Sequence, residues 1–144
     1  MPIKNYTTKV PAAQSVGEIV GALVEHGATR IQQEYTQGKP VSVAFAIDTP
    51  AGPRGFKLPS SAERVRAVLV AQKVEVDAAQ AERIAWRILR DWVMAQMAIL
   101  ETEMVAIDQV FLPYMTDDRG KTVYELYRSQ KLPMLMLGEA PNNT

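Results

Sequence analysis

Residues 41–47 read Val41-Ser42-Val43-Ala44-Phe45-Ala46-Ile47, and this alternation sets the architecture of the chain. Large apolar side chains occupy every second position, and small or polar ones lie between them. A period of two is typical of a strand with one buried and one wet face. We therefore expect a half-buried β-strand here.

Turn-forming residues flank this strand on both sides. Gly38-Lys39-Pro40 precedes it, and Thr49-Pro50-Ala51-Gly52-Pro53 follows it. Glycine and proline at such positions end strands and form tight connections. The sequence thus predicts two further strands, at residues 30–35 and 54–58, and the simplest arrangement of the three is an antiparallel meander.

Helix-start signals bracket the predicted sheet. Serine followed by glutamate three residues later occurs at Ser15 to Glu18 and again at Ser60 to Glu63, a pattern that satisfies two free amides at a helix start. Apolar residues at helical spacing follow each one. We expect helices over residues 16–26 and up to about residue 73.

The carboxyl-terminal half is predicted to be helical. Residues 78–112 contain neither proline nor glycine and follow a third start signal at Asp77, so they predict one long helix or two collinear ones. Thr122 to Glu125 begins a short last helix, and the apolar tail at residues 132–137 is expected to dock on the core or on a partner. The expected class is α+β, a single domain over residues 1–144 with an α-β-β-β-α unit at 15–73 and a helical part at 78–137.

Composition excludes several kinds of function. The 144 residues include no cysteine and one histidine, which excludes disulfides, thiolate metal sites and a thiol nucleophile. No acid–base pair or triad occurs at a recognisable spacing, so we expect no enzyme activity, no metal and no cofactor. The absence of a secretory signal pattern and of a long apolar run predicts a cytoplasmic protein without a membrane partner.

The middle of the long helical segment is unusually apolar. Residues 92–100 carry no formal charge, and a helix that is apolar nearly all round is buried on more than one side. The core of the same chain is one source of that second cover. The other is a second chain, and we predict a dimer or larger homo-oligomer with an interface at Trp86, Trp92, Met94 and Met97.

Arginines are the strongest candidate binding residues. Arg83, Arg87 and Arg90 project from one helical face, and guanidinium groups bind phosphates in a bidentate manner. Arg54, Lys57, Arg64 and Arg66 form a second basic cluster around the third strand and the second helix. The two groups together predict one cationic side, and the alternative is an ordinary solvated face partly neutralised by Glu82 and Asp91.

Two resemblances add a setting. The element order over residues 15–73 resembles the double-stranded-RNA-binding domain, but the lysines that begin that family's second helix are absent here. Lys4-Asn5-Tyr6, Gly27-Ala28, Ala85-Trp86-Arg87 with Asp91-Trp92, and Val110-Phe111-Leu112-Pro113-Tyr114 resemble a family of small uncharacterised proteins of bacteriophages, prophages and mobile elements. This second resemblance implies a biological setting and no chemistry.

Two functions follow as expectations. The first is a non-catalytic phage or mobile-element accessory protein that binds nucleic acid or a nucleotide-like anion through the cationic side. The second is a homo-oligomeric interaction module that sequesters or inhibits a host protein. Lysine and arginine balance aspartate and glutamate at 16 each, so no overall field favours nucleic acid, and zero net charge favours the second function.

Overall fold

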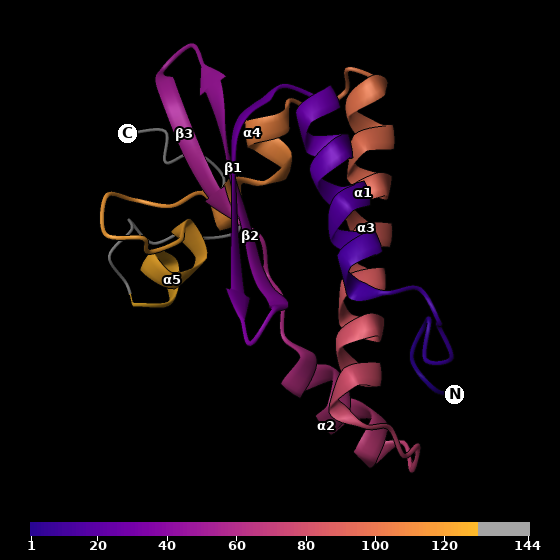
Figure 1. The fold of residues 1–144 in the computed structure, drawn as a ribbon. Coiled ribbons are helices and arrows are strands. Elements are labelled where there is room, and N and C mark those ends of the chain that lie inside the picture. Colours follow the sequence, from indigo (N-terminus) through magenta and orange to yellow (C-terminus); the bar gives the residue numbers. More distant parts are fainter. Residues whose placement is uncertain (130–144) are drawn as a thin grey trace, which may run out of the picture.

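The computed structural model describes residues 1–129 and has an α+β fold (Figure 1). Its elements, in chain order, are α1 (Ala12–Glu25), β1 (Ala28–Thr36), β2 (Lys39–Thr49), β3 (Gly52–Lys57), α2 (Ala62–Ala71), α3 (Ala78–Glu101), α4 (Ile107–Val110), the 3₁₀ turn η1 (Leu112–Tyr114) and α5 (Val123–Arg128). The expected fold class is confirmed. The predictions for the tail at residues 132–137, and for the end of the helical part at residue 137, lie outside the described residues.

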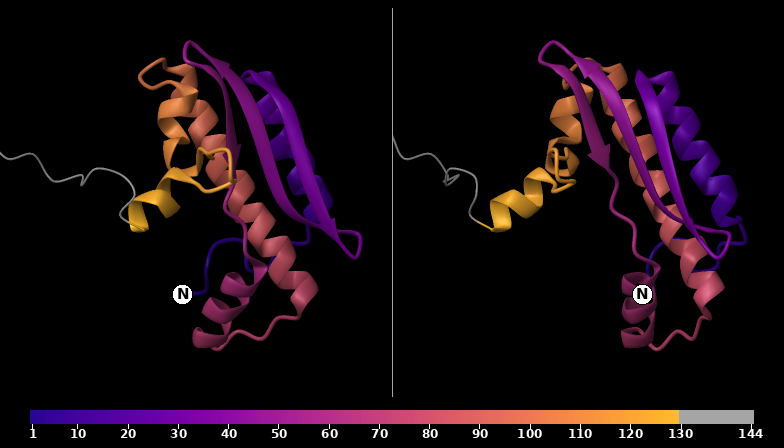
Figure 2. Two further views of the ribbon diagram at one scale, coloured as in Figure 1. Left: turned by 90° about the vertical axis from the view of Figure 1, so that its left-hand side faces the viewer. Right: turned by 60° about the vertical axis from the view of Figure 1, so that its left-hand side comes forward.

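The sheet is an antiparallel meander in the order β1-β2-β3. Helices α1 and α3 lie side by side behind one face of it, and the other face is turned toward the viewer in the left panel of Figure 2. We call the face toward α1 and α3 the inner face and the opposite one the outer face. The chain after η1 runs along β3, where Met115 pairs with Phe56.

The core lies between the inner face and the two helices. Val43, Phe45 and Ile47 of β2 are buried there, as their alternation predicts. The rings of Phe45 and Phe56 stack with centroids 5.0 Å apart, and Phe111 meets Phe45 edge-on at 5.4 Å. Apolar burial of this kind is the main driving force for folding.

Val41 departs from the predicted alternation. Its side chain is 43% exposed, because a bulge interrupts the β1–β2 ladder there. Glu34 pairs with Ser42 and the next residue, Tyr35, pairs with Pro40, so Val41 has no partner across the ladder. An extra residue in one strand turns its side chain out of the regular pattern.

Helix α1 begins earlier than the sequence predicts. It starts at Ala12, after Pro11, and the amide of Gln14 donates to the Pro11 carbonyl at 3.0 Å. The predicted cap, Ser15, lies inside the helix and is fully buried. The three later start signals are confirmed at the predicted residue or the next one, with Ser61 capping α2, Asp77 capping α3 and Thr122 capping α5.

Helix α3 ends at Glu101, well before residue 112. Glu103 adopts a left-handed backbone conformation with φ of 61°, which stops the helix. The chain then turns, and α4 lies beside the sheet instead of along the axis of α3 (Figure 1). Helix α2 packs on α3 at the end away from α4.

Candidate anion-binding site

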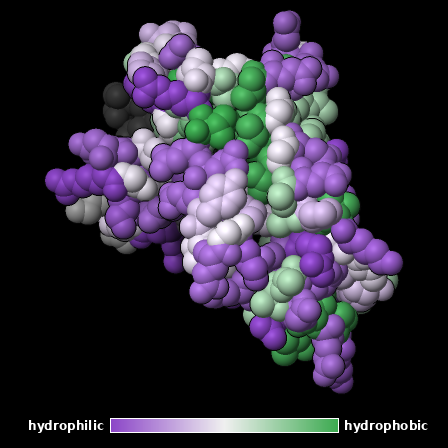
Figure 3. Space-filling model, in the orientation of Figure 1, coloured by the Kyte–Doolittle hydropathy of each residue, from purple (hydrophilic) through white to green (hydrophobic). Residues whose placement is uncertain are grey.

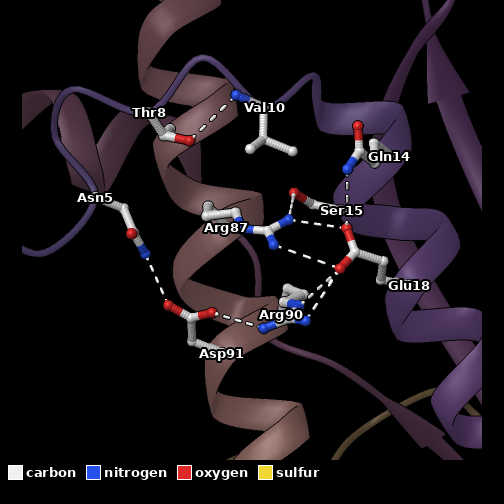
Figure 4. A network of polar contacts seen from close by, with 9 residues as sticks. All are labelled: Asn5, Thr8, Val10, Gln14, Ser15, Glu18, Arg87, Arg90 and Asp91. Carbon is white, nitrogen blue, oxygen red and sulfur yellow. Dashed lines mark hydrogen bonds and ion pairs between the residues drawn. The ribbon is translucent and has the colours of Figure 1, made fainter.

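Two of the three aligned arginines bind carboxylates of the same chain (Figure 4). Arg87 donates to both oxygens of Glu18, at 2.9 and 3.4 Å, and to the Ser15 hydroxyl at 3.2 Å. Arg90 donates through Nε to Glu18 at 3.1 Å and through a terminal nitrogen to Asp91 at 3.2 Å. These contacts join α3 to α1, and they neutralise the charges that were expected to face a ligand.

Asp91 extends this network to the amino terminus. It accepts from the Asn5 amide at 2.9 Å and pairs with Lys4 at 3.0 Å. Burial by itself raises the pKa of Asp91, but the hydrogen bonds from Asn5, Lys4 and Arg90 outweigh burial and hold the pKa below its ordinary value. The carboxylate is therefore charged at neutral pH and fastens residues 4 and 5 to α3.

Arg83 is held differently from its two neighbours. Its Nε donates to the side-chain oxygen of Gln80 at 2.8 Å, and among residues 1–129 no carboxylate pairs with it. The amide nitrogen of Gln80 donates in turn to the carbonyls of Tyr6 and Thr8, at 3.1 and 2.9 Å. Gln80 thus orients Arg83 without neutralising it.

Arg83 lines a hollow of about 390 Å³ with two lysines. Lys9 reaches it from the segment before α1, and Lys39 from the start of β2. Of residues 1–129, Glu82 alone brings a carboxylate to the lining, and its Oε1 lies 3.8 Å from Nζ of Lys39. Three cations against one anion leave the hollow with an excess of positive charge.

The walls of the hollow are uncharged and suit a small organic group. They consist of Pro11, Ala12, Ala79 and Gln80. Gln80 and Ala79 belong to the first turn of α3, where the helix dipole favours a negative charge. The volume falls in the range of small-ligand pockets.

The other predicted basic residues do not join Arg83. In the β2–β3 ladder Arg54 pairs with Ile47, which faces the core, whereas Lys57 pairs with Ala44 on the outer face. Arg54 and Lys57 therefore lie on opposite faces of the sheet. Arg64 and Arg66 are exposed on α2, so the predicted cations are spread over four surfaces, namely the two faces of the sheet, α2 and α3, instead of one.

The predicted apolar interface is mainly part of the core. Trp86 and Met97 are only 2% and 3% exposed, and the Trp86 indole donates to the Pro40 carbonyl at 3.2 Å. Trp92 packs edge-on against Phe111 and Tyr114, and Met94 is also partly buried. The core of the same chain thus buries most of the apolar surface of residues 92–100, including the part that was predicted to contact a second chain.

Sequence reasoning missed Lys9, Lys39 and Gln80. These residues come from three segments far apart in the chain, so no local spacing connects them. Lys39 is the first residue of β2 and precedes Pro40, whereas Lys9 lies two residues before Pro11, so neither residue carries a local signal that points to the other. Their meeting at Arg83 follows from the packing of α3 beside α1 and β2.

The fold and the lining define a small α+β domain with a cationic hollow at the start of its longest helix. Comparison of the chain with family models, with curated proteins and with solved structures gave no match. No helix within residues 1–129 is long and apolar enough to cross a bilayer.

Proposed function

We propose that this chain is a non-catalytic accessory protein of the phage or mobile-element type that binds a phosphate-bearing ligand at Lys9, Lys39 and Arg83. The ligand is nucleic acid or a nucleotide-like anion. The observation that carries the proposal is the contrast within one helical row. Arg87 and Arg90 bind carboxylates, whereas Arg83 is oriented by a neutral amide beside two lysines.

The chemistry of the three side chains favours a phosphate over a neutral or apolar ligand. Arginine offers a planar fork of donors that matches two phosphate oxygens, and lysine adds a compact point charge. Lys9 is exposed and the Lys39 side chain is 50% exposed, so both can move toward a bound anion. The apolar wall of Pro11, Ala12 and Ala79 suits the sugar or base attached to that phosphate.

Binding assays with separate ligand arms test the proposal. Labelled single- and double-stranded DNA and RNA are titrated at about 50 mM salt, where release of counterions makes polymer binding strongest. A nucleoside triphosphate and inorganic phosphate are tested in parallel by thermal shift. Polymer binding with a steep salt dependence identifies nucleic acid as the ligand, and a thermal shift with the nucleotide alone identifies a small-molecule site.

Substitutions locate the binding. Lys9→Ala is expected to weaken binding and to reduce the slope of log affinity against log salt by roughly one unit for a polymer. Arg119→Ala serves as the matched control, because Arg119 is an exposed cation in the turn between η1 and α5. Failure of every ligand to bind at low salt, or an equal loss in the Arg119 variant, contradicts the proposal.

A further inference from the structure

Strand β1 forms a free edge of the sheet. It pairs with β2 along one side, and within residues 1–129 no strand pairs along the other (Figure 2). Such an edge presents a row of unpaired amides and carbonyls that another strand can continue. The nine residues of β1 therefore offer a long template for strand addition.

The sequence of β1 is complementary to itself in one register. The ladder is regular from Arg30 to Glu34, and Arg30, Gln32 and Glu34 share the outer face. Consider two antiparallel copies of β1 related by a twofold axis perpendicular to the sheet. Because side chains alternate between the two faces, the outer faces of the copies coincide only when one residue lies opposite its own copy at the axis. An axis at Gln32 puts Arg30 of each copy opposite Glu34 of the other.

Neighbouring registers lose this match. An axis at Ile31 puts Arg30 opposite Gln32, and an axis at Gln33 puts Arg30 opposite Thr36. In the described part of the chain neither Arg30 nor Glu34 forms an ion pair, so both charges are free to bind across the edge. Opposite charges directly across two strands stabilise their pairing.

The flank of α1 next to this edge suits a second helix. Ala13, Gly17, Val20 and Val24 recur at helical spacing on the side away from Glu18, which points toward α3. Val24 is 53% exposed, and a Cβ added at Gly17 meets no atom within 4 Å. Figure 3 shows apolar surface gathered between α1 and the sheet edge in the upper half of the view.

The spacing of the layers fits two α1 helices side by side. Helix α1 contacts both β1 and β2, so its axis lies beneath the edge of the sheet. Paired strands are about 4.8 Å apart, so a helix beneath the midpoint of β1 and β2 lies about one strand spacing from the twofold axis. The two helix axes are then roughly 10 Å apart, a distance at which helices pack. Small side chains on the facing flanks permit this approach.

We propose that two copies of this protein form a twofold dimer through β1, centred on Gln32, with their α1 helices in contact. The two meanders become one antiparallel sheet of six strands. This interface involves none of Lys9, Lys39 and Arg83, and it stands independently of phosphate binding.

A charge swap tests the dimer. Light scattering after gel filtration is expected to give twice the 16.0 kDa of one chain. Arg30→Glu and Glu34→Arg each bring like charges together twice, and each is expected to weaken the dimer by about tenfold or more. The double variant restores both opposite-charge pairs and is expected to restore the dimer.

Two further variants keep the test decisive. Lys57→Glu reverses a charge on β3, the strand at the opposite edge of the sheet from β1, and is expected to leave the mass of the dimer unchanged. Gly17→Arg, at an exposed position where an added Cβ meets no atom of the monomer within 4 Å, is expected to break the contact between the α1 helices. A 16.0 kDa species at tens of micromolar, or a dimer that is indifferent to all three β1 variants, overturns the proposal.

Discussion

Glu18 supplies the charged contact between α1 and α3. One carboxylate binds two guanidinium groups, and its side chain is 29% exposed. Hydrogen bonds to charged groups contribute more than neutral ones, and removal of one partner leaves the other charges unsatisfied. Serine followed by glutamate three residues later is typical of a helix cap, so Ser15 and Glu18 were predicted to cap α1. The packing of α3 against α1 shows that they bind Arg87 instead.

Glu18→Gln is expected to lower the free energy of unfolding by about 2 kcal/mol, since the partly buried Arg87 loses its carboxylate partner and Arg90 loses one of its two. Urea denaturation followed by circular dichroism measures the change. Glu25→Gln, an exposed change of the same kind in the same helix, is the control and is expected to have little effect. Equal losses in the two variants would show that the ion pairs add no stability.

Asp91 makes stability depend on pH. Its folded-state pKa is lower than its unfolded value, so its contribution is present above the unfolded pKa near 4 and is lost as the pH falls through the folded pKa. Asp91→Asn is therefore expected to destabilise the protein at pH 7. At acidic pH the difference in stability between the variant and the unsubstituted protein is expected to become smaller. Thermal melts from pH 7 down to pH 3 check this, and a difference that stays constant would contradict it.

The elements were predicted more accurately than their ends. The period of two at residues 41–47 and the long segment without proline or glycine were sufficient for the meander and for α3. The end of α3 was not visible, because a glutamate occupies the left-handed position where glycine is the usual signal. The start of α1 was masked by a stronger cap pattern three residues downstream, at Ser15.

Glu103→Gly is expected to stabilise the protein by about 0.5–1 kcal/mol, because glycine adopts the left-handed conformation without a Cβ clash. Glu101→Gly, in the last turn of the helix itself, is the opposite control and is expected to destabilise by a similar amount. Chemical denaturation of the two variants checks the sign of each change.

At the scale of the whole molecule, equal numbers of acidic and basic residues conceal an uneven distribution of free charge. Carboxylates bind Arg87 and Arg90, while Lys9 and Arg83, which line one hollow, pair with no carboxylate of residues 1–129. The sequence could predict that arginines line one side of α3, because helical spacing is local. It could not predict which of them are neutralised, because Glu18 and Lys9 reach α3 from distant parts of the chain.

The affinity of Arg83→Ala and Arg87→Ala for the ligand that binds the unsubstituted protein tests the central claim most directly. At about 50 mM salt and a temperature where both variants are folded, Arg83→Ala is expected to bind about tenfold more weakly with an unchanged melting temperature. Arg87→Ala is expected to melt several degrees lower and to keep its affinity. Loss of affinity in the Arg87 variant equal to that in the Arg83 variant would contradict the division of the arginine row into one binding residue and two structural ones.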